Sequence, residues 1–272
     1  MAERITSTAN PLVKRLAALK VRAERRRSGR YLVEGARELG RARDAGVKVE
    51  QVVVSPELWG AHEEVVANRL RSDGAEWVEM GSAAFSRVSV RRHPDGLAGV
   101  AVNDPRRLDD LALGSSALVL VIDGVEKPGN LGAMLRSADA AGADAVVVAV
   151  RMVPGEEPAD LTSPNVIRAS QGAVFSVPWA VAPVDDVVGW ARRRGLALVA
   201  ADAKAAESLW EVDLTGRTAV VVGAEAAGLS DVIRQSGRAV AIPMSGASDS
   251  LNASVAAALL LYEAVRQRSL GG

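Results

Sequence analysis

Two patterns of apolar residues alternate along the second half of the chain. Continuous aliphatic runs predict buried strands at 117–123, 145–150, 196–202, 218–223 and 239–244. Apolar residues at helical spacing predict helices at 130–142, 164–174, 184–194, 229–236 and 250–268. Unbroken apolar strands separated by helices are typical of an α/β fold with a parallel sheet covered on both faces. Ligands of such sheets bind beyond the carboxyl ends of the strands, so the residues of interest follow Asp123, Val150, Asp202, Val222 and Ile242.

The first half shows a looser alternation. Leu12, Leu16 and Leu19 lie on one face of a short helix expected over 10–20. Short β-type runs at 31–35, 51–55, 76–80 and 97–102 then alternate with helical stretches at 36–46 and 57–72, which predicts a small α/β unit. Residues 103–116 are polar and rich in turn formers, as in a linker. We therefore expect two domains, residues 1–107 and 108–272.

Charge divides the chain at the same place. Residues 1–107 carry 20 basic and 14 acidic side chains, whereas residues 108–272 carry 13 and 19, so the net charge of zero is a cancellation. Nine basic residues lie within the first thirty, which favours a polyanionic partner. No aromatic residues lie among them, so phosphate contacts are expected rather than base stacking, with a solvated charged arm as the alternative. The RNA-contact candidates are Arg22, Arg25, Arg26, Arg27 and Arg30.

Several chemistries are excluded by composition. The chain has no cysteine, and therefore no disulfide, thiolate zinc site, iron–sulfur cluster or cysteine nucleophile. Its two histidines, His62 and His93, exclude a multi-histidine metal site, and both lie in segments typical of the surface. The longest apolar stretch, Ala253–Tyr262, is too short for a membrane span, and the amino terminus has no apolar signal segment. We expect a cytoplasmic protein without a metal or a membrane contact.

Two of the expected loops carry glycines beside polar side chains. In the first, Gly129 and Gly132 flank Asn130, and Arg136 follows one helical turn later, which suits phosphate or ribose contact. The alternative is that Asn130 only caps a helix and Arg136 lies on a solvated face. The second, residues 223–230, resembles a phosphate-binding loop but has Leu229 where the lysine belongs and places Glu225 inside the cradle. A ligand with ribose hydroxyls or a positive centre fits this loop better.

A third polar segment follows the last strand. Ser250 can cap the final helix, and Asn252 projects from its first turn. Helix capping does not explain why Pro243, Met244 and Gly246 gather at the same strand end. The sequence contains no G-x-G-x-x-G motif, so a nucleotide-dependent enzyme with an ordinary dinucleotide site has little support.

Together these segments resemble the SpoU branch of the knotted SPOUT methyltransferases. The matching motifs are Asn130-x-Gly132-x-x-x-Arg136 with Gly142, Gly223-Ala224-Glu225-x-x-Gly228-Leu229-Ser230, and Ile242-Pro243-Met244-x-Gly246 followed by Ser250-Leu251-Asn252-x-Ser254-Val255. The segment 168–173 is similar to the middle stretch of that family, and the resemblance covers about residues 117–268. Lys127, Ala226 and Ala253 are small departures from the usual motifs. Residues 30–58 are similar to a substrate-recognition domain related to ribosomal protein L30e.

The resemblance implies a fold, a cofactor and a reaction. It implies a trefoil knot that forms the cofactor pocket, a homodimer, and methyl transfer from S-adenosyl-L-methionine (AdoMet) to a ribose 2′-hydroxyl in RNA. The product is S-adenosylhomocysteine (AdoHcy), and neither a metal nor DNA is involved. The implied residues that orient the reacting groups are Arg136, Asn130, Glu225, Ser250 and Asn252, and those that contact the cofactor are Gly223, Ala224, Ile242, Met244 and Leu251.

Three questions stay open at this stage. Arg136 is implied as the activator of the hydroxyl, but a guanidinium is effectively never deprotonated in proteins, so a grip on the neighbouring phosphate is the preferred hypothesis. A full α/β domain in front favours 23S ribosomal RNA, in ribosome maturation or antibiotic resistance, over transfer RNA. A non-catalytic RNA-binding adaptor with the same fold is the alternative from another class.

Overall fold

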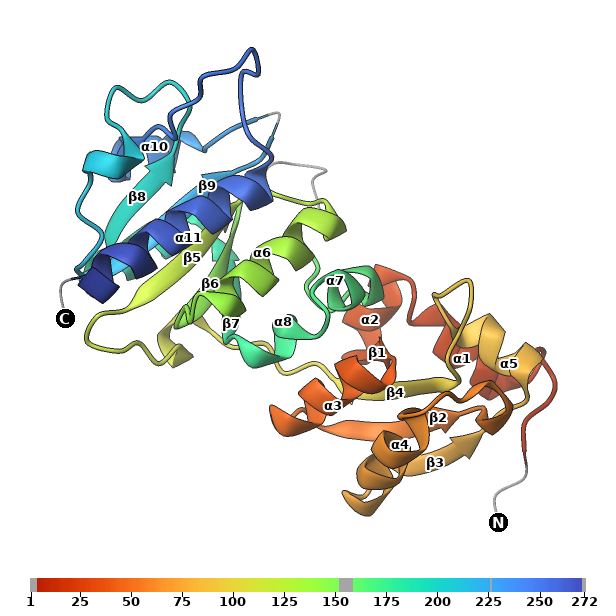
Figure 1. Ribbon diagram of the computed structural model, residues 1–272. Coiled ribbons are helices and arrows are strands. Elements are labelled where there is room, and N and C mark those ends of the chain that lie inside the picture. Colours follow the sequence, from red (N-terminus) through yellow and green to blue (C-terminus); the bar gives the residue numbers. More distant parts are fainter. Residues whose placement is uncertain (1–3, 152–158, 226, 271–272) are drawn as a thin grey trace. The chain divides into compact units, whose positions relative to one another are not determined.

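The computed structural model describes residues 4–151, 159–225 and 227–270, which form two compact units (Figure 1). The first unit comprises Met1–Asp104 together with Asp160–Ser176, and the second comprises Pro105–Ala159 and Val177–Gly272. The α/β class, with a parallel sheet between helices and a smaller amino-terminal domain, is confirmed. The knot that the resemblance implies stays a prediction.

The second unit is built on a six-stranded sheet in the order β10-β8-β9-β5-β6-β7. All five strand pairings are parallel. The strands are β5 (Leu118–Asp123), β6 (Ala145–Val150), β7 (Trp179–Pro183), β8 (Ala197–Ala201), β9 (Thr218–Gly223) and β10 (Arg238–Val240). Their carboxyl ends therefore meet at one edge, where the loops carrying the predicted motifs begin.

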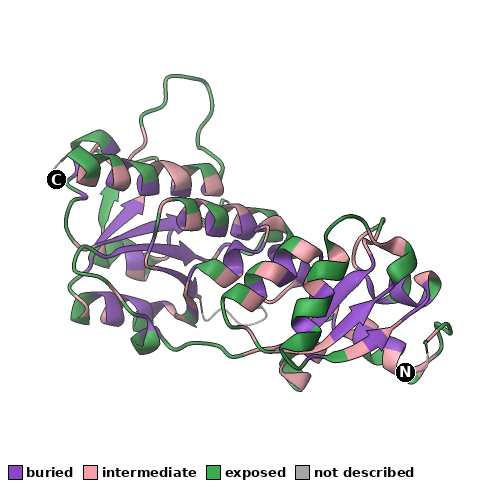
Figure 2. Cartoon of the chain, turned by 60° about the horizontal axis from the view of Figure 1, so that its bottom comes forward, coloured by how far each residue is buried: buried purple, intermediate pink, exposed green. Residues whose placement is uncertain are grey.

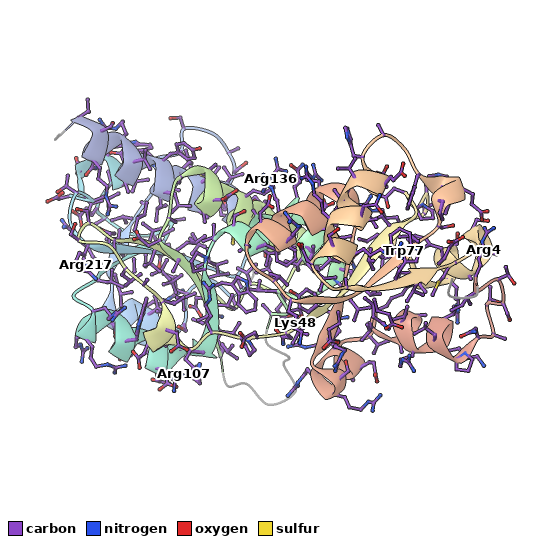
Figure 3. All side chains as sticks on the ribbon, turned by 90° about the horizontal axis from the view of Figure 1, so that it is seen from below. Arg4, Lys48, Trp77, Arg107, Arg136 and Arg217 are labelled. Carbon is purple, nitrogen blue, oxygen red and sulfur yellow. The ribbon has the colours of Figure 1, made fainter. Side chains whose placement is uncertain are left out.

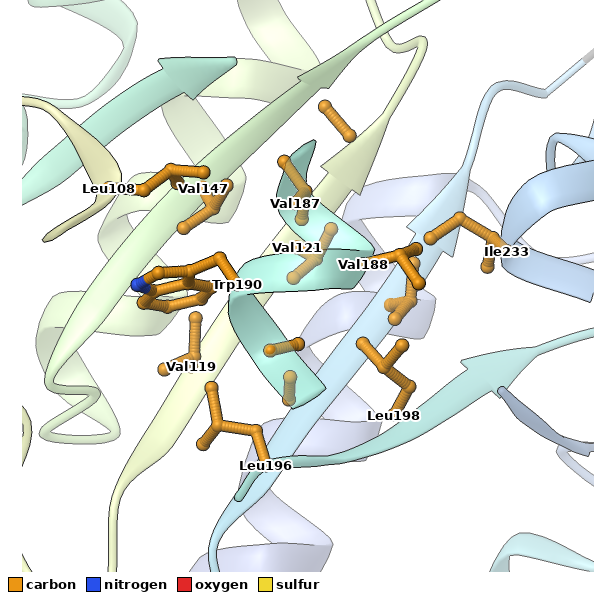
Figure 4. Close-up of a cluster of buried hydrophobic side chains, with 14 of the residues drawn as sticks. Leu108, Val119, Val121, Val147, Val187, Val188, Trp190, Leu196, Leu198 and Ile233 are labelled. Carbon is orange, nitrogen blue, oxygen red and sulfur yellow. The ribbon is translucent and has the colours of Figure 1, made fainter. Parts of the chain in front are cut away.

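Helices cover both faces of this sheet. Helix α11 (Ala253–Leu270) packs against α6 (Pro128–Ala140), β9 and β5 on one face. Helices α9 (Val184–Arg193) and α10 (Asp231–Ser236) lie on the other. There Trp190 of α9 packs with Val119, Val121 and Val147 in a buried aliphatic cluster (Figure 4). All six residues of β5 are buried, as expected for a central strand. Figure 2 shows that strands are the most buried parts of the chain. Short 3₁₀ turns, Leu108–Asp110 and Leu209–Glu211, complete the unit.

The first unit has a mixed four-stranded sheet in the order β1-β4-β2-β3. Only the β2–β3 pairing is parallel. The elements of its first segment are α1 (Pro11–Ala18), α2 (Arg22–Ser28), β1 (Arg30–Glu34), α3 (Ala36–Asp44), β2 (Val49–Val54), the turn Pro56–Leu58, α4 (Glu63–Ser72), β3 (Glu76–Glu79), α5 (Ser82–Val88) and β4 (Leu97–Val102). A core of side chains from α1, α5 and the sheet includes Leu16, Phe85 and Met80.

The second segment of the first unit comes from between β6 and β7. It forms α7 (Pro164–Ala169), which packs on β1, and α8 (Ala173–Ser176), which packs on α3. Arg25 forms an ion pair with Asp160, and the rings of Tyr31 and Phe175 stack with centroids 6.5 Å apart. The sequence pattern assigned these residues to the domain 108–272, whereas their contacts lie with the first unit.

Several element boundaries differ from the sequence-based expectation. The helix expected over 57–72 begins only at Glu63, because a 3₁₀ turn at Pro56 and a loop precede it. The helix expected over 164–174 breaks at Gln171, whose φ is 54°. The final helix is capped by Asn252 rather than Ser250, since Asn252 Oδ1 accepts the Ser254 N–H at 2.8 Å. In the described part of the chain, no helix is long and apolar enough to cross a membrane.

Candidate functional site

A pocket of about 330 Å³ lies at the carboxyl ends of β8, β9 and β10. This is within the range of about 300–1,000 Å³ that is typical of small-molecule sites. All five predicted cofactor-binding residues line it, and the predicted catalytic residues Glu225 and Ser250 join them in the pocket wall. The five are Gly223, Ala224, Ile242, Met244 and Leu251.

The loop after β9 folds back tightly on the strand that precedes it. Gly228 N donates to Ala224 O at 2.8 Å, and Gly228 has a φ of +63°. A Cβ on Gly223 would lie 2.7 Å from Leu229 N and closer still to the carbonyl of Gly228. Glycine at 223 is thus required by this close approach, and the folded-back loop forms one wall of the pocket.

Polar side chains from three separate segments meet beside the pocket. Asn130 of α6 donates from Nδ2 to Glu225 Oε1, and Asn252 Nδ2 lies 3.3 Å from Asn130 Oδ1. Lys127 Nζ is 3.8 Å from the other Glu225 oxygen. The alternative in which Asn130 caps its helix is wrong, because α6 begins after Lys127 and the side chain of Asn130 reaches Glu225 instead. One residue of each predicted motif therefore joins a single hydrogen-bonded cluster.

Arg136 does not join this cluster. It lies exposed on α6 (Figure 3) and forms no hydrogen bond or ion pair with any residue that the structure describes. Ser250 lies in the pocket wall but not in the hydrogen-bonded cluster. The structure thus brings together Asn130, Glu225 and Asn252, and leaves the guanidinium of Arg136 available to a ligand.

Charged residues that sequence reasoning missed also line the pocket. Asp202 and Lys204 follow β8, Arg234 lies on α10, and Asp249 precedes the final helix. The loop after Asp202 follows a strand end and is expected to reach a ligand, but no motif singles out these four side chains. Among the described residues, no cluster of three or more histidine or carboxylate side chains could hold a metal ion.

The predicted RNA-contact arginines have different environments. Arg25 is only 6% exposed and donates to Leu19 O and Lys20 O besides its ion pair with Asp160. It is a core residue of the first unit and not a surface contact. Arg27 pairs with Glu24 and Arg30 with Glu50, whereas Arg26 is exposed without a partner among the described residues. Arg22 is half-buried and engaged in interactions within the fold.

The ion pair of Arg25 is reflected in the acidity of Asp160. Burial alone raises the pKa of this carboxyl, but hydrogen bonds from Arg25 and Thr162 outweigh burial, so its pKa is lowered. The charged form of Asp160 is therefore the one that stabilises the first unit.

Comparison with known proteins defines the class to which this architecture belongs. A solved structure described as an RNA 2′-O ribose methyltransferase matches with a TM-score of 0.83 and 43% identity, covering 98% of this chain and 100% of the other. An AdoMet-bound rRNA methyltransferase from Sinorhizobium meliloti matches with a TM-score of 0.86 and 30% identity, covering 97% of each chain. The 23S rRNA (uridine(2479)-2′-O)-methyltransferase of Streptomyces viridochromogenes is 32% identical over 99% of this chain and 94% of its own.

Family models agree with these relatives. The model of the SpoU rRNA Methylase family matches residues 117–262, and that of the MRM3-like substrate binding domain matches residues 10–99. The chain belongs to the SpoU rRNA methylase family, whose members are AdoMet-dependent methyltransferases. The resemblance stated from the motifs is confirmed.

The residues of the pocket fit AdoMet chemically. Ile242, Met244 and Leu251 offer apolar surface to an adenine ring. Main-chain groups of residues 223–225 and 227–229 can bond to ribose hydroxyls, and the carboxylate of Glu225 can face a positive sulfur centre.

Proposed function

We propose that this protein transfers a methyl group from AdoMet to a ribose 2′-hydroxyl of 23S ribosomal RNA. The observation that carries the proposal is the hydrogen-bonded cluster of Asn130, Glu225 and Asn252, one residue from each motif, beside a pocket that holds all five predicted cofactor contacts. The likeness to the 23S rRNA methyltransferase of Streptomyces viridochromogenes supports ribosomal RNA as the substrate.

The protein needs to align two bound reactants rather than to supply a metal or a covalent intermediate. When bound, the cofactor supplies a methyl group that is already activated by the positive charge of its sulfur. Aligning two reactants can lower a barrier by roughly 7–11 kcal/mol at best. Glu225, held by Asn130 and Lys127, orients groups at the pocket wall, while Asn252 fixes Asn130 from the start of α11.

Arg136 is proposed to bind the phosphate next to the target ribose. Its guanidinium is exposed and lacks a partner among the described residues, and a guanidinium fork matches phosphate oxygens in a bidentate way. In that position it also stabilises negative charge on the 2′-oxygen as the proton leaves to phosphate or water. Because guanidinium groups keep their protons, we do not assign it the role of general base.

The amino-terminal domain, expected over 1–107, is proposed to recognise the RNA, and the domain expected over 108–272 to transfer the methyl group. Residues 160–176 pack on the first of these two domains. Support comes from the match of residues 10–99 to a substrate binding domain and from the exposed basic residue Arg26. Arg27 and Arg30 are exposed, and each can leave its carboxylate partner to bind a phosphate. The surface ion pair that is lost is worth only about 0–1 kcal/mol.

We also propose that the protein acts as a homodimer in the cytoplasm. Helix α11 exposes Val255 and Tyr262, which are seven residues apart and therefore lie on one face of the helix. Exposed apolar surface of this kind favours burial against a second copy.

The ribosomal RNA methyl group is proposed to serve ribosome maturation or resistance to a ribosome-targeting antibiotic. Growth of a deletion strain with and without such antibiotics distinguishes the two.

The test is transfer of labelled methyl from AdoMet to separated, unmodified 23S, 16S and transfer RNA, followed by ribose-specific mapping of the product. We expect incorporation at one 2′-oxygen of 23S RNA and its loss in Arg136→Ala. Transfer to tRNA alone would move the assignment to a tRNA methyltransferase. Absence of transfer to every RNA by a folded protein that binds RNA would replace it with a non-catalytic adaptor.

A further inference from the structure

A buried ion pair lies at the carboxyl end of the central strand, outside the residues that line the pocket. Asp123, the last residue of β5, is fully buried, and Arg151, just after β6, has a side chain that is 16% exposed. Arg151 Nε is 2.9 Å from Asp123 Oδ1, and Arg151 Nη2 donates to the main-chain oxygen of Asp123 at 3.1 Å. Replacing a buried ion pair by apolar residues is often neutral or stabilising. Stability alone thus gives no reason for charges among aliphatic strands.

Both members of this pair bond to the main chain of the loop after β9. The Ser230 N–H donates to Asp123 Oδ2 at 2.6 Å, and Arg151 Nη2 donates to the carbonyl of Gly228. Asp123 pairs in register with Gly223 on one side and Ala149 on the other. The ion pair therefore joins the ends of three neighbouring strands and holds Gly228 and Ser230 of the loop after β9 from outside the pocket.

A glycine leaves space for the side chain of Arg151. A Cβ on Gly124, which has a φ of +72°, would lie 2.7 Å from Arg151 Nε, so the Arg151 side chain passes directly over this glycine. The loop that it holds carries Glu225, which accepts the hydrogen bond from Asn130, and contributes Gly223, Ala224 and Gly228 to the pocket wall.

We propose that Asp123 and Arg151 are positioning residues for methyl transfer, which hold Gly228 and Ser230 of the loop after β9 where the described residues of that loop form the cofactor pocket and present Glu225 to Asn130. This inference rests on the proposed function. Neither side chain lines the pocket, so both act through the main chain of the loop. When the bonds of Asp123 and Arg151 to the loop are weakened, only a fraction of the molecules holds the loop in place. The apparent Kd for the cofactor then equals the Kd of the competent molecules divided by that fraction.

Two conservative variants of the full-length protein test the proposal. Arg151→Lys keeps the charge but loses the fork that reaches Asp123 and Gly228 together. Asp123→Asn keeps the shape but can accept only one of the two bonds, because its other terminal atom is a donor. Each is expected to raise the Kd for AdoHcy and the KM for AdoMet about tenfold or more. Hydrogen exchange should accelerate in peptides covering 223–231 and stay unchanged in the other strands of the sheet.

Arg217→Lys is the matched control. Arg217 precedes the same strand β9 at its amino end (Figure 3) and donates to the main-chain oxygens of Arg194, at 3.0 Å, and Gly114. The same substitution there removes comparable bonds from the opposite end of the strand. It is expected to lower the melting temperature as Arg151→Lys does, and to leave the Kd for AdoHcy within twofold of wild type.

Ser230→Pro breaks the same contact from the side of the loop. Ser230 has a φ of −67°, which proline adopts, but the ring carbon that replaces the N–H would push against the Asp123 carboxylate, so the bond from the loop to Asp123 is lost. It too should raise the Kd for AdoHcy about tenfold. The proposal is overturned if the folded variants bind AdoHcy within twofold of wild type, or if Arg217→Lys weakens binding equally. Absence of AdoHcy binding by the wild-type protein would instead overturn the cofactor assignment itself, and this inference with it.

Discussion

Arg136 differs from Asn130, Glu225 and Asn252 because its guanidinium has no partner among the described residues. If it grips the target phosphate, Arg136→Ala should lower kcat about 100- to 1,000-fold, as the loss of a well-placed donor to transition-state charge does. Arg136→Lys should be nearly as poor, since an ammonium cannot reproduce the fork. Single-turnover methyl transfer at saturating AdoMet measures the effect, and RNA affinity should stay close to wild type.

Arg192→Ala is the control for this substitution. Arg192 is an exposed arginine on α9, which covers the opposite face of the same sheet from α6. Its removal should leave kcat unchanged. Substantial activity of Arg136→Lys with a displaced pH profile would contradict the phosphate grip and favour proton transfer.

The variant Gly223→Ala tests how closely the loop after β9 approaches the end of that strand. An added Cβ would collide with main-chain atoms of Gly228 and Leu229, which cannot move aside as a flexible side chain can. We expect Gly223→Ala to raise the Kd for AdoHcy at least tenfold, equivalent to about 1.4 kcal/mol of binding free energy, as measured by calorimetry. Gly216→Ala, before the same strand and with open space around its Cβ position, should bind normally. Equal binding by both variants would show that the loop has room to adjust.

Site residues were predictable from the sequence where they belong to a motif in a loop that follows a strand. The parallel sheet brings such loops together at the pocket. Gly223 and Leu251 lie 28 positions apart in the sequence and both line the pocket, because β9 ends and the final helix begins at the same edge of the sheet. Lys204 and Arg234 were missed because no motif surrounds them. Arg25 looked like its neighbours in the basic run, and only the packing of residues 160–176 reveals that it is buried.

At the scale of elements, the exposed apolar face of α11 predicts a dimer. Val255 is 46% and Tyr262 49% exposed, while Ala257, Leu260 and Leu261 bury the other face. A charge placed on an apolar interface is costly unless it is paired. Val255→Glu combined with Tyr262→Glu should therefore convert a dimer into a monomer in size-exclusion chromatography with light scattering.

Val65→Glu provides the matched control for that variant. Val65 is 53% exposed and is the one exposed large apolar side chain of α4 in the first unit. This change should leave the oligomeric state as it is. A wild-type monomer, or a dimer that survives both charges on α11, would count against the interface.

Elements were predictable where the apolar pattern is strong and uninterrupted. The five aliphatic runs all form parallel strands, although β10 is only three residues long. Strand β7 was not expected, because Trp179–Pro183 is short, half-exposed and ends in proline, which suits its position at the edge of the sheet. The arm of basic residues proved to contain the helix α2, whose Arg25 is fixed by tertiary contacts that local sequence does not reveal.

At the scale of the whole molecule, the division into domains is the feature that sequence could least predict. Charge and the linker pattern mark a boundary near residue 107, and the contacts place one between Asp104 and Pro105. Nothing in the local pattern of 160–176 distinguishes it from the other helical stretches of the second half. Its assignment to the first unit depends on contacts across more than a hundred residues, such as Arg25 with Asp160.

This organisation predicts that a fragment ending at residue 107 lacks part of its own core. Without 160–176, the guanidinium of Arg25 loses its carboxylate partner, and the ring of Tyr31, which is 6% exposed, loses the stack with Phe175. Breaking a buried ion pair by removing one partner costs about 3–5 kcal/mol, a large part of the 5–15 kcal/mol that stabilises a typical domain. Fragment 1–107 should therefore melt at a much lower temperature than the first unit of the intact chain.

A matched second fragment joins residues 160–176 to the end of residues 1–104 through a flexible glycine–serine linker. It should recover cooperative melting, because the linker restores the contacts of α7 with β1 and of α8 with α3. In this rescued fragment, Asp160→Asn should remove much of the gain, since the charged carboxylate is the stabilising form. Equal stability of fragment 1–107 with and without the added segment would show that residues 160–176 only rest on the first unit.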